Sequence, residues 1–518
     1  MTDAVPHAFN MAHYCIGRAA AATPEKTALL VYDTPGASQP VEQWRFIDLE
    51  NTVLRFAAGL RERGLKPGDR VAIHLGNHSA SALLFFAAIA GGFVALPVSD
   101  QLTLPELRTL LDDSGAAVIA TSQPLAKDAV PTGVRVLLPQ DLDAMFQDST
   151  ASTDCGTLPG YAETSANDPA FLIYTSGTTA KPKGVLHAHR SAWGRRPMYQ
   201  GWYGITPDDR VLHAGSFNWT YTLGAGLTDP WANGATAIVY TGAKKPELWP
   251  QLIAATGATI FAAVPGIFRQ ILKYAAPGAD DLGRLRHGLM AGETPPPDLI
   301  TAWTAATGRP LYEALGMSEI STYISTGPSV PPRAGPVGKA QAGRRIAILA
   351  LEGGDDPLPA GHEGLIAVHR SDPGLMLGYW NRPAEDAVVL RGPWFIGGDI
   401  GRMDDDGYIT HFGRANELLN AGGYRVSPLE IEAVLATMAG VAEAACAEVE
   451  VAPGVRVIGA FIVTTPGARI EAAMVTAFAA ERLAAYKCPR EIAFVAQLPR
   501  TANGKIQRSA LAKLVPIA

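Results

Sequence analysis

The chain contains the stretch Thr175-Ser-Gly-Thr-Thr-Ala-Lys-Pro-Lys-Gly184 between two short apolar runs, Phe171–Tyr174 and Val185–Leu186. The two runs predict strands, and the residues between them predict a loop that binds a polyphosphate. Backbone N–H groups and hydroxyls donate hydrogen bonds, lysines supply charge, and glycines allow close approach. The stretch is not a P-loop, because the Gly-x-x-x-x-Gly-Lys-Ser/Thr spacing is absent. Composition alone leaves a solvated hairpin loop as the alternative.

The overall composition is typical of a soluble globular protein. The 518 residues favour two to four domains, with 47% hydrophobic residues, 18% charged residues and a net charge of −6. The absence of a long basic run argues against a dedicated nucleic-acid binder. The cysteines Cys15, Cys155, Cys446 and Cys488 are far apart. We therefore expect neither a disulfide framework nor a zinc site. We expect a cytoplasmic location.

Two further patterns argue against secretion and membrane insertion. The first residues lack the basic and apolar regions of a signal peptide. The longest apolar run, Ala82 to Val98, is interrupted by Gly91-Gly92 and Pro97. This run predicts a buried helix followed by a buried strand rather than a membrane span.

Helix and strand patterns alternate through the first 320 residues. Strands are expected near 70–75, 93–98, 116–121, 235–240, 259–263 and 289–291, with helices between them. This rhythm predicts an α/β fold with mainly parallel sheets covered by helices. Because ligands bind at the carboxyl ends of such strands, Ala291-Gly292-Glu293 and Gly316–Glu319 are site candidates.

The pattern becomes β-rich from residue 336, with a strong hairpin turn at Asp404–Gly407. We expect a large domain over 1–414 and a small mobile α+β domain over 415–518. In the small domain, Ser427-Pro-Leu-Glu430 predicts a capping box with proline at the first helical position. Asn503-Gly504 predicts a second hairpin turn, which places Lys505 on an exposed turn.

Six motifs occur in one order along the chain: Tyr174–Gly184, Gly316-Met-Ser-Glu319, Gly398-Asp-Ile-Gly401, Gly413-Arg414, Asn420-Ala-Gly-Gly-Tyr-Arg425 and Arg500-Thr-Ala-Asn-Gly-Lys505. Their order and spacing resemble the adenylate-forming superfamily, which includes acyl-CoA synthetases, peptide-synthetase adenylation domains and luciferase. The resemblance covers nearly the whole chain. Ser216-Phe-Asn-Trp219 resembles medium-chain acyl-CoA synthetases, and Tyr424–Glu430 fits both those enzymes and benzoate-type CoA ligases.

The resemblance implies an ATP-dependent carboxylate–CoA ligase. In such enzymes a carboxylate attacks the α-phosphate of ATP, which gives acyl-adenylate and pyrophosphate, and the thiol of coenzyme A then displaces AMP. The implied small molecules are ATP, Mg²⁺, coenzyme A and a small carboxylic acid. Negative charge gathers at the α-phosphate in the first step, so fixed cations there are the expected catalysts.

By resemblance, Lys505 is that catalytic cation and Glu319 is the acid associated with Mg²⁺. Asp399 matches the carboxylate that accepts from the ribose hydroxyls, and Arg414 is its neighbour. The remaining segments implied to bind ATP or AMP contribute Thr175, Ser176, Gly177, Thr178, Thr179, Lys183, Ala291, Gly292, Glu293, Gly316, Met317 and Ser318. Leu315 and Ser318 depart from the family's common tyrosine and threonine.

For the second step, the resemblance implies a rotation of the small domain about a hinge. Asn416 lies at the hinge position, where aspartate is usual. Gly422 and Gly423 match the glycine-rich segment that lets a pantetheine arm pass. Candidates for contacts to CoA phosphates or AMP, with surface charge and packing as the alternative, are Arg425, Tyr486 and Lys487.

The predicted acyl pocket is aromatic. Trp219 matches the residue that lines the acyl site and gates the thiol tunnel, and Phe217, Tyr221 and Tyr323 are expected beside it. Such a pocket favours short or medium aliphatic, alicyclic or aryl acids over long fatty acids.

Two other functions are weighed against the ligase. A stand-alone adenylation enzyme that loads a carrier protein is disfavoured, because Ser216–Leu223 contains no acid to hold a substrate amine. A non-catalytic nucleotide-binding protein is disfavoured by Lys505, Glu319 and Asp399. The oligomeric state stays open, with a homodimer as one alternative. Acylation of Lys505 by a lysine acyltransferase, reversed by a deacylase, would remove its charge and is expected to inactivate the enzyme.

Overall fold

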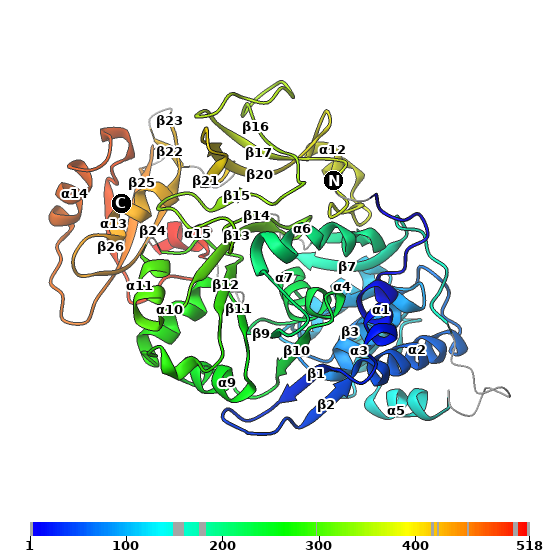
Figure 1. Cartoon of the computed structure of the whole chain (residues 1–518). Coiled ribbons are helices and arrows are strands. Elements are labelled where there is room, and N and C mark those ends of the chain that lie inside the picture. The colour runs from blue at the N-terminus through cyan, green and yellow to red at the C-terminus, as the bar shows by residue number, and fades with distance from the viewer. Residues whose placement is uncertain are drawn as a thin grey trace.

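The structure is a computed structural model that describes residues 4–148, 160–175, 183–296, 298–415, 419–421, 424–452, 455–500 and 506–514. A large domain contains two mixed sheets covered by helices, and a small α+β domain lies beside it, drawn in orange and red (Figure 1). The predicted α/β architecture with a small C-terminal domain is confirmed.

The first sheet has the strand order β18-β8-β7-β4-β3-β5-β6. Its strands are β3 (Arg70–His74), β4 (Val94–Pro97), β5 (Val118–Thr121), β6 (Arg135–Leu137), β7 (Pro169–Thr175), β8 (Lys183–Ala188) and β18 (Gly378–Tyr379). β3 to β7 pair in parallel, whereas β8 runs antiparallel to β7 with Thr175 opposite Lys183. The two predicted strands that flank the glycine- and lysine-rich stretch therefore pair with each other.

The second sheet has the order β16-β17-β20-β21-β15-β14-β13-β12-β11-β9-β10-β1-β2, with β19 beside β20. Its strands are β1 (Thr27–Tyr32), β2 (Glu42–Arg45), β9 (Arg210–His213), β10 (Thr236–Tyr240), β11 (Ile260–Ala263), β12 (His287–Ala291), β13 (Leu311–Met317), β14 (Ser321–Ser325), β15 (Gly338–Ala340), β16 (Ile346–Leu349), β17 (Glu363–His369), β19 (Leu390–Arg391), β20 (Trp394–Met403) and β21 (Tyr408–Arg414).

The β-rich region expected from residue 336 continues the second sheet rather than forming a sheet of its own. Strands β1 and β9 to β13 pair in parallel, and β14 then pairs antiparallel with β13. The antiparallel strands follow from β14 without a break in the hydrogen-bonded ladder. The predicted hairpin at Asp404–Gly407 is confirmed, because β20 and β21 pair antiparallel and Gly407 has a φ of 81°.

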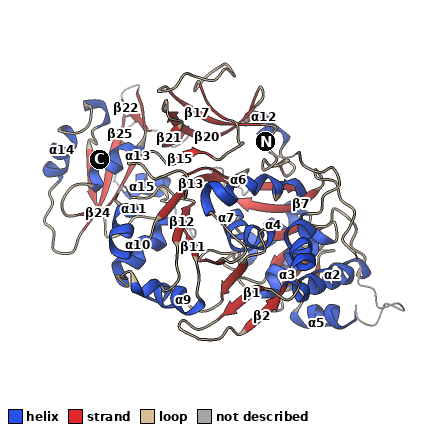
Figure 2. Ribbon diagram, viewed as in Figure 1, coloured by secondary structure: helices blue, strands red, loops and turns tan. Residues whose placement is uncertain are grey.

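Helices cover these sheets, and α10 and α11 lie beside β12 and β13 (Figure 2). The helices of the large domain are α1 (Arg18–Ala22), α2 (Phe46–Glu62), α3 (Ser79–Ala90), α4 (Leu104–Ser114), α5 (Pro139–Asp148), α6 (Arg196–Met198), α7 (Thr220–Leu223), α8 (Asp229–Ala232), α9 (Trp249–Thr256), α10 (Pro265–Tyr274), α11 (Leu299–Thr307) and α12 (Pro383–Val388). Helix α3 is apolar and buried on nearly all sides, and every residue of β4 is buried. The predicted buried helix and strand within 82–98 are confirmed.

The small domain contains β22 (Leu419–Ala421), β23 (Tyr424–Val426), α13 (Pro428–Ala436), β24 (Val441–Ala452), β25 (Val455–Thr464), α14 (Ala472–Ala480), β26 (Glu491–Phe494) and α15 (Arg508–Leu511). The predicted capping box at the start of α13 is wrong. The Ser427 hydroxyl donates to the carbonyl of Phe412 in β21, and Glu430 pairs with Lys487 instead. Proline at the first helical position still begins the helix, since its missing N–H needs no partner there.

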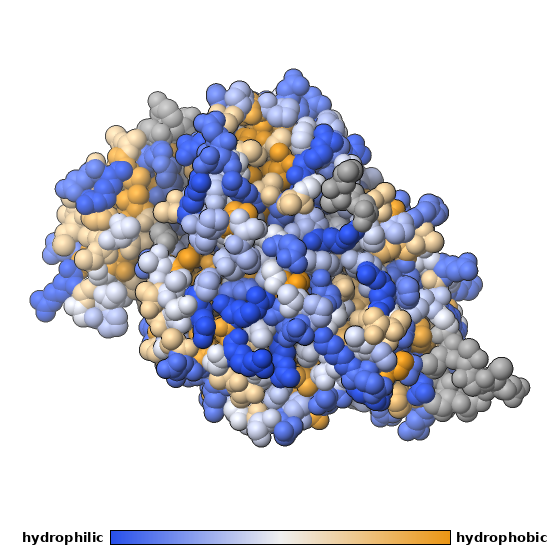
Figure 3. Space-filling view, in the orientation of Figure 1, coloured by the Kyte–Doolittle hydropathy of each residue, from blue (hydrophilic) through white to orange (hydrophobic). Residues whose placement is uncertain are grey.

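The surface mixes polar and apolar residues on the face that Figure 3 displays. No helix within the described ranges is long and apolar enough to cross a membrane. Cys15, Cys446 and Cys488 are free thiols, and Cys155 lies outside the described residues. Among the residues that the structure describes, no cluster of three or more His, Cys, Asp or Glu could hold a metal ion.

Candidate active site

The two predicted strand-end motifs lie next to each other. β12 and β13 are parallel with Ala291 opposite Ala314, so the residues that follow each strand leave the sheet at the same edge. Gly292 has a φ of 97°, a region that side chains disfavour. A Cβ on Gly316 would lie 2.6 Å from the Ser321 carbonyl oxygen, so β13 and β14 approach closely only because this residue is glycine.

Lys183 and Glu319 meet through one tyrosine that no motif pointed to. The hydroxyl of Tyr379 donates a 2.7 Å hydrogen bond to Oε1 of Glu319. Nζ of Lys183 lies 5.5 Å from the centroid of the same ring and pairs with Glu385. Burial, followed by the charge of Glu319, raises the pKa of Tyr379, so its hydroxyl stays a donor. The structure thus brings the end of the predicted phosphate loop to the predicted magnesium acid.

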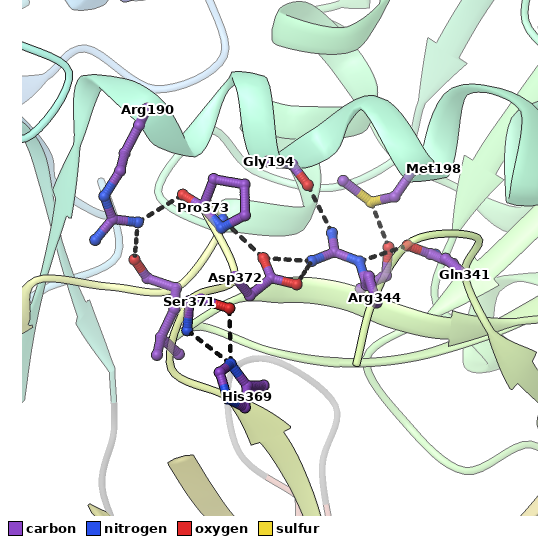
Figure 4. A network of polar contacts seen from close by, with 12 residues as sticks. Arg190, Gly194, Met198, Gln341, Arg344, His369, Ser371, Asp372 and Pro373 are labelled. Carbon is purple, nitrogen blue, oxygen red and sulfur yellow. Dashed lines mark hydrogen bonds and ion pairs between the residues drawn. The ribbon is translucent and has the colours of Figure 1, made fainter. Parts of the chain in front are cut away.

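A network of polar contacts holds the segment that precedes Tyr379 (Figure 4). The guanidinium of Arg344 donates to both carboxylate oxygens of Asp372, at 2.8 and 2.7 Å, and to the carbonyl of Gly194 at 2.8 Å. Arg190 donates to the carbonyls of Pro373 and Leu375 at 2.6 and 2.8 Å. Next along the chain, the N–H of Met376 donates to the carbonyl of Glu319 at 2.7 Å. These contacts fix the backbone on which Tyr379 and Glu319 face each other.

The candidate ribose site lies where β20 and β21 pair. Asp399 is 3% exposed and lies opposite Arg414 in the ladder, with its Oδ1 3.6 Å from Nε of Arg414. Nε2 of His411 is 3.1 Å from the same oxygen. The predicted pair of Asp399 and Arg414 is brought together, and His411 is a third member that the motifs missed. Tyr323 lies close by, since Asp399 and Glu319 both add to the effect of burial in raising its pKa.

The predicted acyl-site aromatics belong to different parts of the core. Phe217 packs with the helices of the first sheet, Tyr221 packs against the parallel strands of the second, and Tyr323 packs among the antiparallel strands. The hydroxyl of Tyr221 donates to the carbonyl of Leu289 at 3.0 Å. Trp219 is half-buried and lies directly before α7. The structure therefore groups Tyr323 with the nucleotide candidates, and its role in an acyl pocket stays a prediction.

The loop that carries Phe217 and Trp219 is held by Asn77, which follows β3 of the first sheet. Nδ2 of Asn77 donates to the carbonyl of Gly215 at 2.6 Å, and its Oδ1 accepts from the N–H of Phe217 at 2.9 Å. One amide thereby satisfies both backbone groups of the loop. No sequence motif marks Asn77, because its two partners, Gly215 and Phe217, lie 138 and 140 residues further along the chain.

The small domain contacts the large one through Glu443 in β24. Its carboxylate pairs with Arg269 of α10 and lies 3.0 Å from Nη2 of Arg500. Arg500 and Ile506 pair as an antiparallel bridge, so the chain enters and leaves 501–505 side by side. Lys487 pairs with Glu430 within the small domain.

Several predicted residues cannot be placed. Only the backbone of Arg425 and Tyr486 is described. The residues that lie outside the described ranges are Ser176, Gly177, Thr178, Thr179, Asn416, Gly422, Gly423 and Lys505. Their roles stay predictions.

Comparison with known proteins agrees with this arrangement. A family model described as AMP-binding enzyme matches residues 16–380, and one described as AMP-binding enzyme C-terminal domain matches 430–505. The chain is 30% identical to a 3-hydroxybenzoate–CoA ligase of Aromatoleum sp. (strain CIB), covering 90% of this chain and 91% of the relative. It is 31% identical to a benzoate–CoA ligase of Thauera aromatica, and the match covers 97% of this chain and 96% of the relative.

Solved structures of MatB share the fold of this chain. ATP-bound MatB from Rhodopseudomonas palustris, 27% identical with 98% of each chain covered, superposes with a TM-score of 0.87. The apo form of MatB, with the same identity and coverage, superposes with a lower TM-score of 0.78. One assignment accounts for the fold, for the two family matches, for the strand-end motifs and for the relatives. The chain belongs to the AMP-binding enzyme family, and within this adenylate-forming superfamily to the branch of carboxylate–CoA ligases.

Proposed function

We propose that the protein is an ATP-dependent ligase that joins an aryl carboxylic acid to coenzyme A in two steps through an acyl-adenylate. The observation that carries the proposal is a cluster of three residues: Lys183 at the start of β8, Tyr379 in β18, and Glu319 just after β13. It combines a cation for phosphate with an acid for a phosphate-bound metal ion. The aryl acid is favoured by the hydroxybenzoate and benzoate relatives.

In the proposed first step, the acid carboxylate attacks the α-phosphate of ATP and pyrophosphate leaves. Thr175, the loop at 176–179 and Lys183 would bind the departing phosphates. Gly292 and Gly316 would let adenine approach the strand ends, and Asp399 would accept hydrogen bonds from the ribose. Lys505 would bridge the carboxylate and the α-phosphate.

The acidic residues near this site suit Mg²⁺ bound mainly through the nucleotide. Mg²⁺ keeps several waters and takes phosphate oxygens as ligands, so one protein carboxylate suffices. Glu319 has one oxygen held by Tyr379. Among the described residues, no group of three or more His, Cys, Asp or Glu could hold a metal ion by itself. Glu319 would therefore hold the ion, which would neutralise phosphate charge.

In the proposed second step, the CoA thiol attacks the acyl-adenylate and AMP leaves. The small domain would rotate at Asn416, and Gly422 and Gly423 would line the passage of the pantetheine arm. Arg425, Tyr486 and Lys487 would contact the CoA phosphates, and Trp219 would border the thiol entry. The higher similarity to ATP-bound than to apo MatB supports a domain arrangement suited to the first step.

The test is acid-dependent pyrophosphate release and AMP formation, measured with and without CoA, in wild type and Lys505→Ala. A charge pair about 4 Å apart is worth roughly 4 kcal/mol at an effective dielectric near 20. Its loss is expected to slow adenylation about a thousandfold. The matched control is Lys513→Ala, which alters an exposed lysine further along the same chain end.

Near-wild-type release in Lys505→Ala would refute the assigned catalyst. Adenylation that is followed by transfer to a carrier protein but never to CoA would instead favour an adenylation enzyme.

A further inference from the structure

The lysine at the end of the predicted phosphate loop is paired with an acid. Nζ of Lys183 forms an ion pair with the carboxylate of Glu385, which lies in α12. The two side chains are 23% and 32% exposed. Both charges are therefore partly open to solvent, where a ligand can reach them. Glu385 lies outside the six ordered motifs and has no part in the two proposed steps.

Both members of the pair stand on backbone that hydrogen bonds hold in place. Lys183 is the first residue of β8, and β18 pairs antiparallel with β8. Just after β18, the N–H of Trp380 donates to the carbonyl of Gly184 at 2.7 Å. Oδ1 of Asp386 in α12 accepts from the N–H of Tyr379 at 2.8 Å. The ion pair can therefore open and close by rotation of its two side chains, while the backbone stays in place.

Lys183 has a second neighbour on the side of the proposed metal site. Its Nζ lies 5.5 Å from the centroid of the Tyr379 ring, and the hydroxyl of that ring donates to Glu319. A lysine side chain is a compact charge on a flexible stem, so it changes partners by rotating. The ammonium group can thus be held by the Glu385 carboxylate or by a phosphate that binds beside Glu319.

Glu385 also has a second cation within reach. Arg382 lies three residues earlier, directly before the first turn of α12. The pKa of its guanidinium is raised mainly by a hydrogen bond to Asp113, and the charge of Glu385 adds to that effect. Glu385 therefore keeps a positive neighbour when Lys183 turns away, which makes the ion pair easier to open.

A polyphosphate and Glu385 compete for one charge. Lys183 supplies a single positive charge, and Glu385 neutralises it in the ion pair. A polyphosphate bound by Lys183 places several negative charges near that carboxylate, and like charges a few ångströms apart repel each other. ATP and pyrophosphate therefore have to displace Glu385 before they can pair with the lysine.

We infer that Glu385 is a counter-ion for Lys183, which the phosphates of ATP displace and which returns as pyrophosphate leaves. The exchange lowers the affinity of the site for ATP and for pyrophosphate alike. It favours the second proposed step, because the ion pair forms again when pyrophosphate departs. The inference rests on the proposed ligase function, and it adds to that function a residue that controls product release.

The first experiment compares wild type with Glu385→Gln by titration calorimetry, which requires no knowledge of the acid substrate. The probes are ATP with Mg²⁺, inorganic pyrophosphate with Mg²⁺, and AMP, which lacks the β- and γ-phosphates. An exposed ion pair shifts an equilibrium by up to about fivefold, so we expect the Kd values for ATP and pyrophosphate to fall about two- to fivefold. The Kd for AMP should not change.

A second lysine variant tests whether Glu385 acts through Lys183. Lys183→Gln should weaken the binding of ATP and pyrophosphate but not of AMP. Adding Glu385→Gln to that variant should then tighten ATP binding less than it does in wild type, because neighbouring residues that act on each other are not additive. The matched control is Glu25→Gln, which removes the same charge from an exposed ion pair with Arg45 and should leave all three Kd values unchanged.

The outcomes separate the inference from the proposed function. A folded Glu385→Gln protein that binds ATP and pyrophosphate no more tightly than wild type would overturn the inference alone. Equal tightening of AMP, or the same gain in the Lys183→Gln background, would also overturn it. Failure of the wild type to bind ATP would overturn the ligase function and the inference with it. Thermal unfolding checks the fold of each variant, and Glu385→Ala supplies the same test if Glu385→Gln does not fold.

Discussion

The hydroxyl of Tyr379 lies 2.7 Å from Oε1 of Glu319 and donates a hydrogen bond to it. Tyr379 belongs to the short strand β18 at the edge of the first sheet, whereas Glu319 follows β13 of the second. The contact therefore joins the two sheets at the candidate active site. The neutral Tyr379 hydroxyl thus orients the Glu319 carboxylate, and Lys183 lies over the ring of the same tyrosine.

Replacing Tyr379 with phenylalanine removes this hydrogen bond and keeps the ring beneath Lys183. A hydrogen bond to a charged group is worth about 1.5–3 kcal/mol, so we expect pyrophosphate release to fall about 10- to 100-fold. Titrating Mg²⁺ and ATP should show the loss mainly as weaker binding of the metal–nucleotide complex. Tyr274→Phe, at a 54% exposed tyrosine, is the control. An unchanged Mg²⁺ dependence would contradict a positioning role for Tyr379.

Replacing Asn77 with alanine releases the loop that carries Phe217 and Trp219. Two hydrogen bonds to backbone groups are lost, at about 1 kcal/mol each, so kcat/KM for the acid and for CoA should fall on the order of tenfold. The KM for ATP should hardly change, since the two hydrogen bonds hold the loop that carries Phe217 and Trp219, which are predicted to line the acyl site. Asn51→Ala in α2 is the control. Equal losses for all three substrates would argue for general destabilisation instead.

Replacing Glu443 with glutamine weakens the contact between the two domains. Glu443 pairs with Arg269 and Arg500, and exposed ion pairs contribute about 0.2–1 kcal/mol. We expect acid-dependent pyrophosphate release to slow about threefold, while the reaction of synthetic acyl-adenylate with CoA keeps its rate. Glu448→Gln is matched, because Glu448 lies on the same strand and pairs with Arg456 inside the small domain. Slowing of both half-reactions alike would rule out a selective role for the contact.

Glu313 in β13 should make stability depend on pH. Burial raises the pKa of its carboxyl to about 8 from an ordinary value of 4.5. Between these values the folded protein holds a proton that the unfolded chain has lost, so stability falls as pH rises from about 5 to 8. Glu313→Gln should remove this loss, and its Tm relative to wild type should be higher at pH 8 than at pH 5. Glu481→Gln, at an exposed position, should show no such trend. A constant Tm difference across this range would contradict the prediction.

Much of the fold could be predicted because its signals are local. The buried helix predicted within 82–98 and the strands near 70–75 and 235–240 follow from runs of apolar residues and from glycine or proline at their ends. The segments of Gly292 and Gly316 were predicted from their places at strand ends, and the structure then showed a φ of 97° at Gly292 and no room for a Cβ at Gly316. The capping box at Ser427 failed because a partner distant in sequence, Phe412, engaged the hydroxyl.

The sequence by itself determined the order of elements, the family and the identity of the charged groups that chemistry at a phosphate requires. Only the tertiary structure decided which groups meet. Tyr379 reaches Glu319 across 60 residues, and Asn77 reaches Phe217 across 140. Such contacts depend on how the two sheets pack together. No local pattern of residue types encodes which residues meet when that packing forms.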